Sequence, residues 1–310
     1  MAESVRAFAP ATASNIACGF DIMGFAVDGP GDEVIAARRD RPGIEILEIT
    51  GDEGRLPLEA ERNTAGVAVT ELLRLTDRRE AGVTLRVHKK MPLSSGLGSS
   101  AASAVAAAKA TAELLGIEAD RSLLLRCALE GERIACGSAH PDNATPCVYG
   151  GFVLIRSSDP LDVIELPVPE DLTCALVRPH VEVRTRDARE ALGTTVELPA
   201  AVRQWANVGA LVAGLFRGDL ELISRSLHDH IAEPKRAHLV AGFPEAKAAA
   251  TDAGALGCSL SGSGPTIFAL CHGIESAERA ADAMVAAIRS VGVEADRLVS
   301  KVGTRGARIL

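Results

Sequence analysis

The chain has few aromatic residues: Phe, Trp and Tyr make up 3% of its 310 residues, with a single Trp and a single Tyr. Proteins that bind nucleic acids commonly stack bases on aromatic side chains and carry an excess of positive charge. Here the formal net charge is -8 at pH 7. The composition therefore argues against a nucleic-acid partner, and it implies that local basic groups hold any anionic substrate.

The seven cysteines form no C-x-x-C pair and no zinc-ligand spacing. Their number is odd and most lie in apolar sequence, which is typical of buried free thiols in a reducing cytosol. No apolar run approaches the roughly 18 residues of a membrane helix. The first residues, MAESVRAFAP, do not form the apolar core of a signal peptide. We therefore expect a soluble, cytoplasmic protein without a membrane partner.

The pattern of apolar and polar residues predicts an α+β fold, because strands and helices mix without regular βαβ alternation. Alternation predicts strands at GDEVIAARR, IEILEIT, VTLRVHKKMP and FVLIRS. Helical spacing predicts helices over residues 62–76, 100–115, 121–135, 201–217, 219–232, 244–256 and 276–292. We expect HPDNATPCVYGG and GCSLSGSGP to be loops. A run rich in proline and acids near 156–170 marks the expected boundary between two domains.

The most informative segment is residues 92–109, PLSSGLGSSAASAVAAAK. A loop of glycines and serines runs here into an alanine-rich helix. Glycines let the backbone approach an anion, successive N–H groups point at it, and the positive end of the helix dipole lies behind them. The serine hydroxyls add ligands for phosphate oxygens or magnesium. The segment therefore predicts a nucleotide phosphate loop at a helix N-terminus.

Two better-known phosphate loops fit this segment less well. The Gly-Lys-Ser/Thr of a Walker A loop is lacking. Gly96-Leu-Gly98-Ser-Ser-Ala101 matches the loose dinucleotide pattern, and acids follow about twenty residues on. However, Asp120 leads into a helical pattern and is better explained as an N-cap than as the end of a buried strand. A plain glycine-serine turn remains the alternative.

Two further glycine-serine segments accompany the loop. Residues 10–24, PATASNIACGFDIMG, place Asn15 and Asp21 around a glycine. Such residues often bond their own backbone in turns, so a structural role is an equal alternative to substrate binding. Residues 257–266, GCSLSGSGPT, have three glycines and three serines before an apolar strand. That density favours a backbone nest that packs on or completes the phosphate site.

Charged side chains supply the remaining candidates. Phosphoryl transfer from ATP needs a cation that bridges the phosphates, so Glu132 is a candidate magnesium ligand, although acids on helices usually face solvent. His140, Asp142 and Asn143 lie in an expected loop that contains prolines, a typical place for substrate contacts, although a lone histidine there is more often structural.

Basic residues gather at three places. Arg184, Arg186 and Arg189 form one cluster, and Lys235 and Arg236 form another. Arginine grips carboxylates with two hydrogen bonds, which suits an acidic substrate, whereas solvated helix faces are the default. The third group, residues 88–90, HKK, either offsets phosphate charge or keeps an edge strand soluble.

In this order and spacing, the three glycine-serine segments resemble the three motifs of the GHMP small-molecule kinases. HPDNATPCVYGG, TRDAREAL and HIAEPKRAHLVAGF are similar to the homoserine kinase branch of that superfamily. The resemblance covers essentially the whole chain. It implies a two-domain α+β fold, with a ribosomal protein S5 domain 2-like ATP-binding domain over residues 1–160 and a ferredoxin-like α/β domain over 161–310.

The resemblance also implies ATP and Mg²⁺ as ligands. Asn63 matches a position near the adenine. The positions around the phosphates are Pro92, Leu93, Ser94, Ser95, Gly96, Leu97, Gly98, Ser99, Ser100, Ala101 and Ala102. Ser99 and Glu132 correspond to the magnesium ligands, in preference to their neighbours Ser100 and Glu130.

The implied acceptor is L-homoserine. The matching substrate positions are Asn15, Asp21, His140, Asp142, Asn143, Thr185, Arg189 and Arg236. The two arginines would hold the carboxylate, and Asp21 or Asp142 would pair with the ammonium group. One departure is Ala17-Cys18 before Gly19, where the family often has Gly-Pro, which changes the packing near the substrate turn.

The implied reaction is the Mg-ATP-dependent phosphorylation of L-homoserine to O-phospho-L-homoserine for threonine biosynthesis, by an expected homodimer. Asp21 is the candidate base, but direct proton loss to a phosphate oxygen would need none. A GHMP kinase for mevalonate, shikimate or a sugar would not need both arginines and is one alternative. A non-catalytic nucleotide-binding relative is the other.

Overall fold

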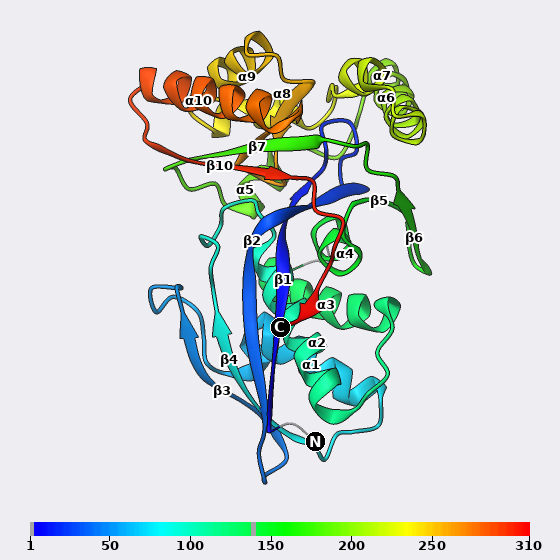
Figure 1. Ribbon diagram of the computed structural model, residues 1–310, viewed down its shortest axis with the longest axis vertical. Coiled ribbons are helices and arrows are strands. Elements are labelled where there is room, and N and C mark those ends of the chain that lie inside the picture. Colours follow the sequence, from blue (N-terminus) through cyan, green and yellow to red (C-terminus); the bar gives the residue numbers. More distant parts are fainter. Residues whose placement is uncertain (1–2, 138–140) are drawn as a thin grey trace.

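A computed structural model describes residues 3–137 and 141–310 (Figure 1). Its larger sheet has seven strands in the order β11-β1-β2-β4-β3, with β5 paired to β2 and β6 to β5. Only β3 and β4 run parallel. The strands are β1 (Ser4–Ser14), β2 (Met23–Arg38), β3 (Gly43–Thr50), β4 (Gly82–His88), β5 (Phe152–Ser158), β6 (Leu161–Leu166) and β11 (Arg308–Ile309).

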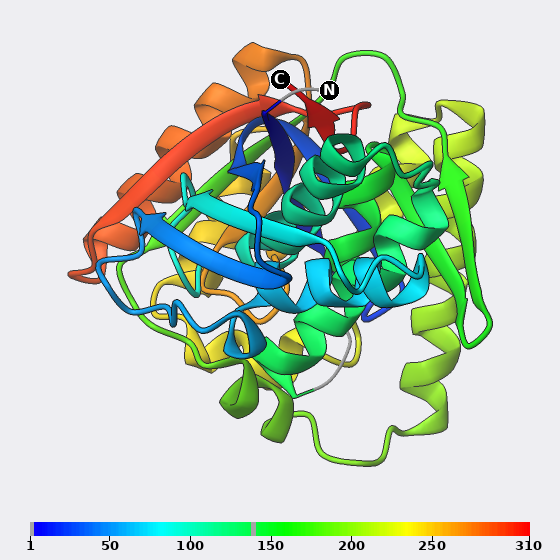
Figure 2. The same ribbon diagram turned by 90° about the horizontal axis from the view of Figure 1, so that it is seen from below.

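The helices of the N-terminal half pack against this sheet and around one central helix. They are α1 (Thr64–Leu75), α2 (Ser99–Leu115), α3 (Arg121–Cys136) and α4 (Pro141–Tyr149). Seen from below, these cyan and green helices lie beside the blue strands (Figure 2). Helix α2 contacts β1, β2, α1 and α3, and its alanines are almost all buried. Small side chains let the helix approach the strands closely, and this brings the start of α2 to the sheet.

The smaller sheet has four antiparallel strands in the order β10-β7-β9-β8. The strands are β7 (Leu172–Pro179), β8 (Gly257–Leu260), β9 (Ile267–His272) and β10 (Ala295–Lys301). Helices α9 (Phe243–Asp252) and α10 (Ile274–Ser290) cover one face and share a second core with it (Figure 1). The other helices of this half are α5 (Thr185–Glu190), α6 (Leu198–Arg217), α7 (Leu220–Ser226) and α8 (Glu233–Arg236).

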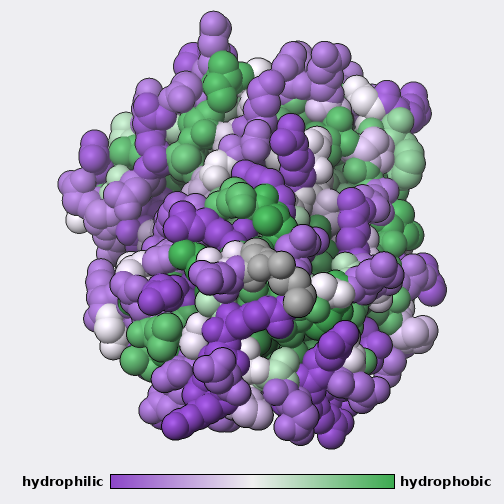
Figure 3. Space-filling model, turned by 60° about the horizontal axis from the view of Figure 1, so that its bottom comes forward, coloured by the Kyte–Doolittle hydropathy of each residue, from purple (hydrophilic) through white to green (hydrophobic). Residues whose placement is uncertain are grey.

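The α+β fold class is confirmed, and so are most of the expected strands and helices. Strand β6 extends the larger sheet past residue 160, and β11 rejoins it at the end of the chain. The boundary between residues 160 and 161 stays a prediction. The six cysteines with described side chains are buried and unpaired. Among the described residues, no helix is both long and apolar enough to cross a membrane. Hydrophilic residues dominate the face in Figure 3, with scattered hydrophobic patches.

Three local expectations were wrong. Residues 141–149 of the expected loop HPDNATPCVYGG form helix α4 instead, and Pro141 occupies its first turn, where a missing N–H costs nothing. The first four residues of GCSLSGSGP form strand β8. The helix expected over 219–232 stops at Ser226, because the Asp229 carboxylate accepts the N–H groups of residues 231–233 and replaces the helical bonds.

Candidate active site

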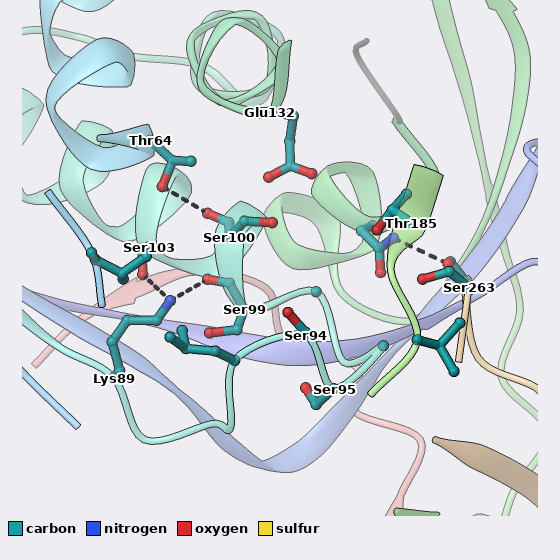
Figure 4. A pocket seen from close by; sticks show the side chains of 18 of the residues that line it. Thr64, Lys89, Ser94, Ser95, Ser99, Ser100, Ser103, Glu132, Thr185 and Ser263 are labelled. Atoms are coloured by element: carbon teal, nitrogen blue, oxygen red, sulfur yellow. Dashed lines mark hydrogen bonds between the residues drawn. The ribbon is translucent and has the colours of Figure 1, made fainter. Parts of the chain in front are cut away.

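A cleft of about 490 Å³ opens at the start of α2, where all three glycine-serine segments meet (Figure 4). Sixteen of the predicted site residues line it: Asn15, Asp21, Asn63, Leu93, Ser94, Ser95, Gly96, Gly98, Ser99, Ser100, Glu132, Asp142, Asn143, Thr185, Arg189 and Arg236. The remaining ones lie elsewhere. Pro92 is exposed, and Leu97, Ala101 and Ala102 point into the core. His140 lies outside the described residues.

The loop before α2 depends on residues that tolerate a left-handed backbone. Ser94, Gly96 and Gly98 have φ values of 52°, 78° and 68°. A Cβ atom on Gly96 would lie 2.6 Å from the carbonyl oxygen of Ser261, and one on Gly98 would lie 2.2 Å from Oγ1 of Thr12. Both glycines are therefore required by their conformation and by close contacts with the other two segments.

The start of α2 is an open helix end. Gly98 is its N-cap residue, and no described side chain caps it with a hydrogen bond. The N–H groups of a first helical turn have no partner within the helix, and they carry the positive end of the dipole. The cleft therefore presents unsatisfied donors and positive potential to any ligand, which suits phosphate.

The third glycine-serine segment packs on this loop, as expected. The Ser261 hydroxyl donates to the carbonyl oxygen of Gly96 at 2.6 Å, and the N–H of Thr266 donates to that of Ser95 at 3.2 Å. The N–H of Gly262 also donates to the carbonyl oxygen of Ser14 at 3.3 Å. The segment thus ties the phosphate loop to strand β1.

The first segment forms a tight turn that is both structural and part of the cleft. Asn15 and Asp21 have φ values of 72° and 61°. The side-chain oxygen of Asn15 accepts the N–H of Asp21 at 3.1 Å, and its amide nitrogen donates to the carbonyl oxygen of Gly262 at 2.8 Å. Asn15 therefore has the structural role of closing the turn, and it also lines the cleft; its role in substrate binding stays a prediction.

Glu132 is a buried carboxylate directed into the cleft (Figure 4). Burial raises its pKa to about 7, and the Asp142 carboxylate adds to the rise, while a hydrogen bond with the Ser100 hydroxyl and the charge of Lys89 oppose it. Its Oε1 atom has no hydrogen-bond partner among the described residues. A buried, unpartnered carboxylate oxygen is costly on its own, and a bound cation would remove that cost.

The described residues contain no group of three or more His, Cys, Asp and Glu side chains that could hold a metal. Magnesium commonly binds through one or two protein ligands together with substrate phosphates and water. One orphaned carboxylate oxygen beside an open helix end fits that mode. The residues present therefore fit Mg²⁺ only as an ion shared with a nucleotide.

The two serines at the start of α2 face different acids. The Ser99 hydroxyl donates to Oδ2 of Asp32 at 2.9 Å, whereas the Ser100 hydroxyl points toward Glu132 (Figure 4). The structure thus brings Ser100 next to the candidate metal ligand. The magnesium role of Ser99 stays a prediction.

At the other end of the cleft, arginines and acids lie together. Arg189 donates to both carboxylate oxygens of Asp21, at 2.6 and 3.3 Å. Arg236 is buried and donates to the carbonyl oxygens of Ala188, at 2.8 Å, and Gly262, at 3.3 Å. Burial and the neighbouring Arg189 lower the pKa of Arg236. This end of the cleft carries charges of both signs.

Two more predicted residues, both on α4, complete this end. Asp142 is buried, and desolvation, followed by the charge of Asp21, raises its pKa to about 6. The Asn143 side chain accepts the Thr12 hydroxyl at 3.0 Å and donates to the Ser14 hydroxyl at 3.1 Å. Those two bonds fix the orientation of the Asn143 amide at the wall of the cleft.

The comparisons with known proteins agree along the whole chain. The family described as GHMP kinases N terminal domain matches residues 63–151, and GHMP kinases C terminal matches residues 211–290. The homoserine kinase of Chlorobium phaeovibrioides is 51% identical, over 99% of this chain and 100% of its own. That of Xylella fastidiosa is 42% identical, over 100% of this chain and 95% of its own. The crystal structure of homoserine kinase from Cytophaga hutchinsonii matches with a TM-score of 0.97 at 52% identity, covering 100% and 98% of the two chains.

This chain belongs to the homoserine kinases of the GHMP kinase family. It also shares its fold with a solved structure of much lower sequence identity. The crystal structure of L. major mevalonate kinase in complex with R-mevalonate matches with a TM-score of 0.72 at 15% identity, over 95% of each chain. Because the chain belongs to the homoserine kinases, other residues that line or adjoin the cleft are further candidates for a functional role.

The sequence allows two alternative roles for Lys89, and it does not identify Asp32 as a residue near the cleft. In this homoserine kinase, Lys89 is buried and bonded to Asp32, which is itself inaccessible. The only signal for Asp32 was that two adjacent acids, Asp32 and Glu33, precede the apolar run VIAA. Arg55 and Arg62 also line the cleft near Asn63, on a stretch whose sequence has no distinctive pattern.

Proposed function

We propose that this protein transfers the γ-phosphoryl group of ATP to the hydroxyl of L-homoserine and releases O-phospho-L-homoserine, the precursor used for threonine. The observation that carries the proposal is that one cleft holds both an open helix end and a cluster of arginines and acids. The first suits a polyphosphate, and the second suits an amino acid.

At the donor end, the amides of the loop and of the first turn of α2 would bind phosphate oxygens. Mg²⁺, when bound, neutralises charge on the β- and γ-phosphates. Glu132 would hold it, with either the Ser99 hydroxyl expected from the resemblance or the Ser100 hydroxyl that faces Glu132. Asn63 and the neighbouring Arg55 and Arg62 extend the cleft to where the rest of the nucleotide would lie.

At the acceptor end, the charges match a zwitterion. Arg189 and Arg236 would bind the carboxylate, because a guanidinium pairs with a carboxylate in a planar, two-bonded arrangement. Asp21 or Asp142 would bind the ammonium group, with Thr185 and Asn143 nearby. Neutral sugars need neither charge, and mevalonate has no ammonium group, so the acids favour homoserine over both.

The chain's own contribution to the transfer step would be mostly positioning. Holding the hydroxyl in line with the phosphorus and stabilising charge supply much of the acceleration in phosphoryl transfer. A carboxylate at this end would accept the hydroxyl proton if a base is used. Asp21 is the expected base, and Asp142 is a second candidate, because burial raises its pKa to about 6 and makes it a stronger base than an ordinary aspartate.

A panel of acceptors in an assay coupled to ADP release tests this function. We expect magnesium-dependent ADP release with L-homoserine, and none above background with mevalonate, shikimate or galactose. Turnover of another acceptor without turnover of homoserine would assign a different substrate. Absence of ATP turnover with every acceptor would instead support a non-catalytic nucleotide-binding protein. The expected homodimer is checked separately by light scattering.

A further inference from the structure

Beneath the phosphate loop lies a buried cluster, of which the proposed reaction uses at most Ser99 directly. It joins Asp32 on β2, Lys89 just after β4, and Ser99 and Ser103 on α2. The Lys89 ammonium lies 2.5 Å from Oδ2 of Asp32, and the exposed fractions of the two side chains are 2% and 0%. Figure 4 shows the lysine reaching up to the first turn of α2.

Every donor of this lysine is used inside the protein. Its three N–H groups meet Oδ2 of Asp32, the backbone carbonyl of Ser99 at 2.7 Å and the hydroxyl of Ser103 at 2.7 Å. Oδ2 of Asp32 also accepts both serine hydroxyls at 2.9 Å, and Oδ1 accepts the N–H of Lys90 at 3.0 Å. Lys89 therefore has no donor left for a phosphate in this arrangement, although it lines the cleft.

The cluster instead makes hydrogen bonds to the end of α2 that faces the cleft. Gly98, the N-cap of α2, has a left-handed backbone, and no described side chain caps the helix there. The bonds from Asp32 and Lys89 reach Ser99 through two of its atoms, the hydroxyl and the carbonyl oxygen. They fix the first turn from below, which leaves its N–H groups free on the cleft side.

We propose that the Asp32–Lys89 pair positions the first turn of α2 for the phosphates of the nucleotide. The inference rests on the proposed use of ATP. Neither residue touches the ligand, so both act through Ser99 and the helix backbone. A shift of well under 1 Å in such a site weakens the binding and reactivity of the group it holds.

The chain supplies a matched control in the ion pair formed by the next residue on each side. Glu33 follows Asp32 on β2 and pairs with Lys90, which follows Lys89. Successive side chains of a strand point to opposite faces of the sheet, so this second pair faces away from α2. The Lys90 side chain is 53% exposed. Glu33→Gln/Lys90→Met removes the same two charges without touching the helix end.

The test compares Asp32→Asn/Lys89→Met with that control and with wild type. Changing both partners avoids leaving one buried charge alone. Calorimetry measures the affinities for ATP, ADP and adenosine, and circular dichroism and thermal unfolding report folding. We expect ATP and ADP to bind at least about tenfold more weakly to the Asp32/Lys89 variant, with adenosine binding unchanged. The control variant should bind all three as wild type does.

A second variant, Asp32→Glu, keeps the charge and moves the carboxylate by one methylene. If the double variant does not fold, a selective loss of ATP and ADP binding in Asp32→Glu carries the proposal. Unchanged ATP affinity in a folded variant would overturn it, and so would equal losses for ATP, ADP and adenosine. If wild type itself fails to bind ATP or to phosphorylate homoserine, the proposed function fails first, which is a distinguishable result.

Discussion

Arg189 and Asp21 form an ion pair with two hydrogen bonds inside the cleft, at 2.6 and 3.3 Å, although 168 positions separate them in the chain. Both side chains are about two-fifths exposed, so solvent and ligands reach them. An amino-acid carboxylate has the same charge as Asp21 and can pair with Arg189, and an ammonium group has the same charge as Arg189 and can pair with Asp21. The pair therefore offers one partner for each charged group of a zwitterionic substrate.

We expect Arg189→Leu to raise KM for L-homoserine by roughly tenfold to a hundredfold, because a two-bonded carboxylate contact is lost. KM for ATP should change less than about twofold, since the residue lies at the other end of the cleft. Initial rates with each substrate varied in turn measure both constants. Arg186→Leu is the matched control: Arg186 is exposed on the same helix and pairs with Asp187 and Glu190. A comparable rise in KM for ATP would contradict a role confined to the acceptor.

Ser99 and Ser100 make two predictions that differ in size. The resemblance favours Ser99 as the magnesium ligand, whereas the Ser100 hydroxyl is the one that faces Glu132. From the geometry we expect Ser100→Ala to raise the magnesium concentration needed for half-maximal rate by about tenfold, and Ser99→Ala by less. Titrating Mg²⁺ at fixed ATP measures this. The reverse ranking would return the ligand role to Ser99.

Glu132 predicts how stability depends on pH. Its pKa rises from 4.5 to about 7 on folding, chiefly through burial, so the folded protein holds this proton more tightly than the unfolded chain. Stability therefore falls as pH increases through that window, by roughly 3 kcal/mol from this group at most. Asp142, with a pKa raised to about 6, acts in the same direction.

We accordingly expect Glu132→Gln, without Mg²⁺ or nucleotide, to unfold at a higher denaturant concentration than wild type at pH 8, and to lose less stability between pH 5 and pH 8. The same variant should lose most of its magnesium-dependent activity. Glu130→Gln is the control, since Glu130 lies two residues away on the same helix and pairs with Arg133 near the surface. If the dependence of stability on pH is the same in Glu132→Gln as in wild type, burial does not raise the pKa of this carboxyl.

The three glycine-serine segments could be predicted to meet because glycine and serine at that density have few other uses, and they do meet around Gly96 and Gly98. Helices with a continuous apolar stripe, such as α10, were also predictable from spacing alone. The signal for each of these features lies in consecutive residues, so it can be recognised without knowledge of the tertiary contacts.

The contacts that organise the cleft were not predictable in this way. Lys89 and Asp32 meet because β2 and β4 pair in a register that places residues 57 apart side by side, and nothing in either segment specifies the partner. Helix α4 was missed because two prolines are typical of a loop, although Pro141 sits at a helix start where it is tolerated. The register in which two strands pair, and the position of a proline relative to a helix start, are set by the whole fold.

Gly98 offers the sharpest test of the loop itself. Both Gly98 and Gly116 have left-handed backbones, with φ values of 68° and 65°, at the two ends of α2. A Cβ atom on Gly98 would meet Oγ1 of Thr12 at 2.2 Å, whereas at Gly116 no described atom lies within 4 Å. Gly116→Ala should therefore cost only the backbone strain, about 1 kcal/mol of unfolding free energy. Gly98→Ala should cost more and should also weaken ATP binding, because the loop must shift away from β1 to relieve the contact. Denaturant unfolding and ATP titration of both variants measure the difference, and equal effects at the two glycines would contradict the close packing of the loop on Thr12.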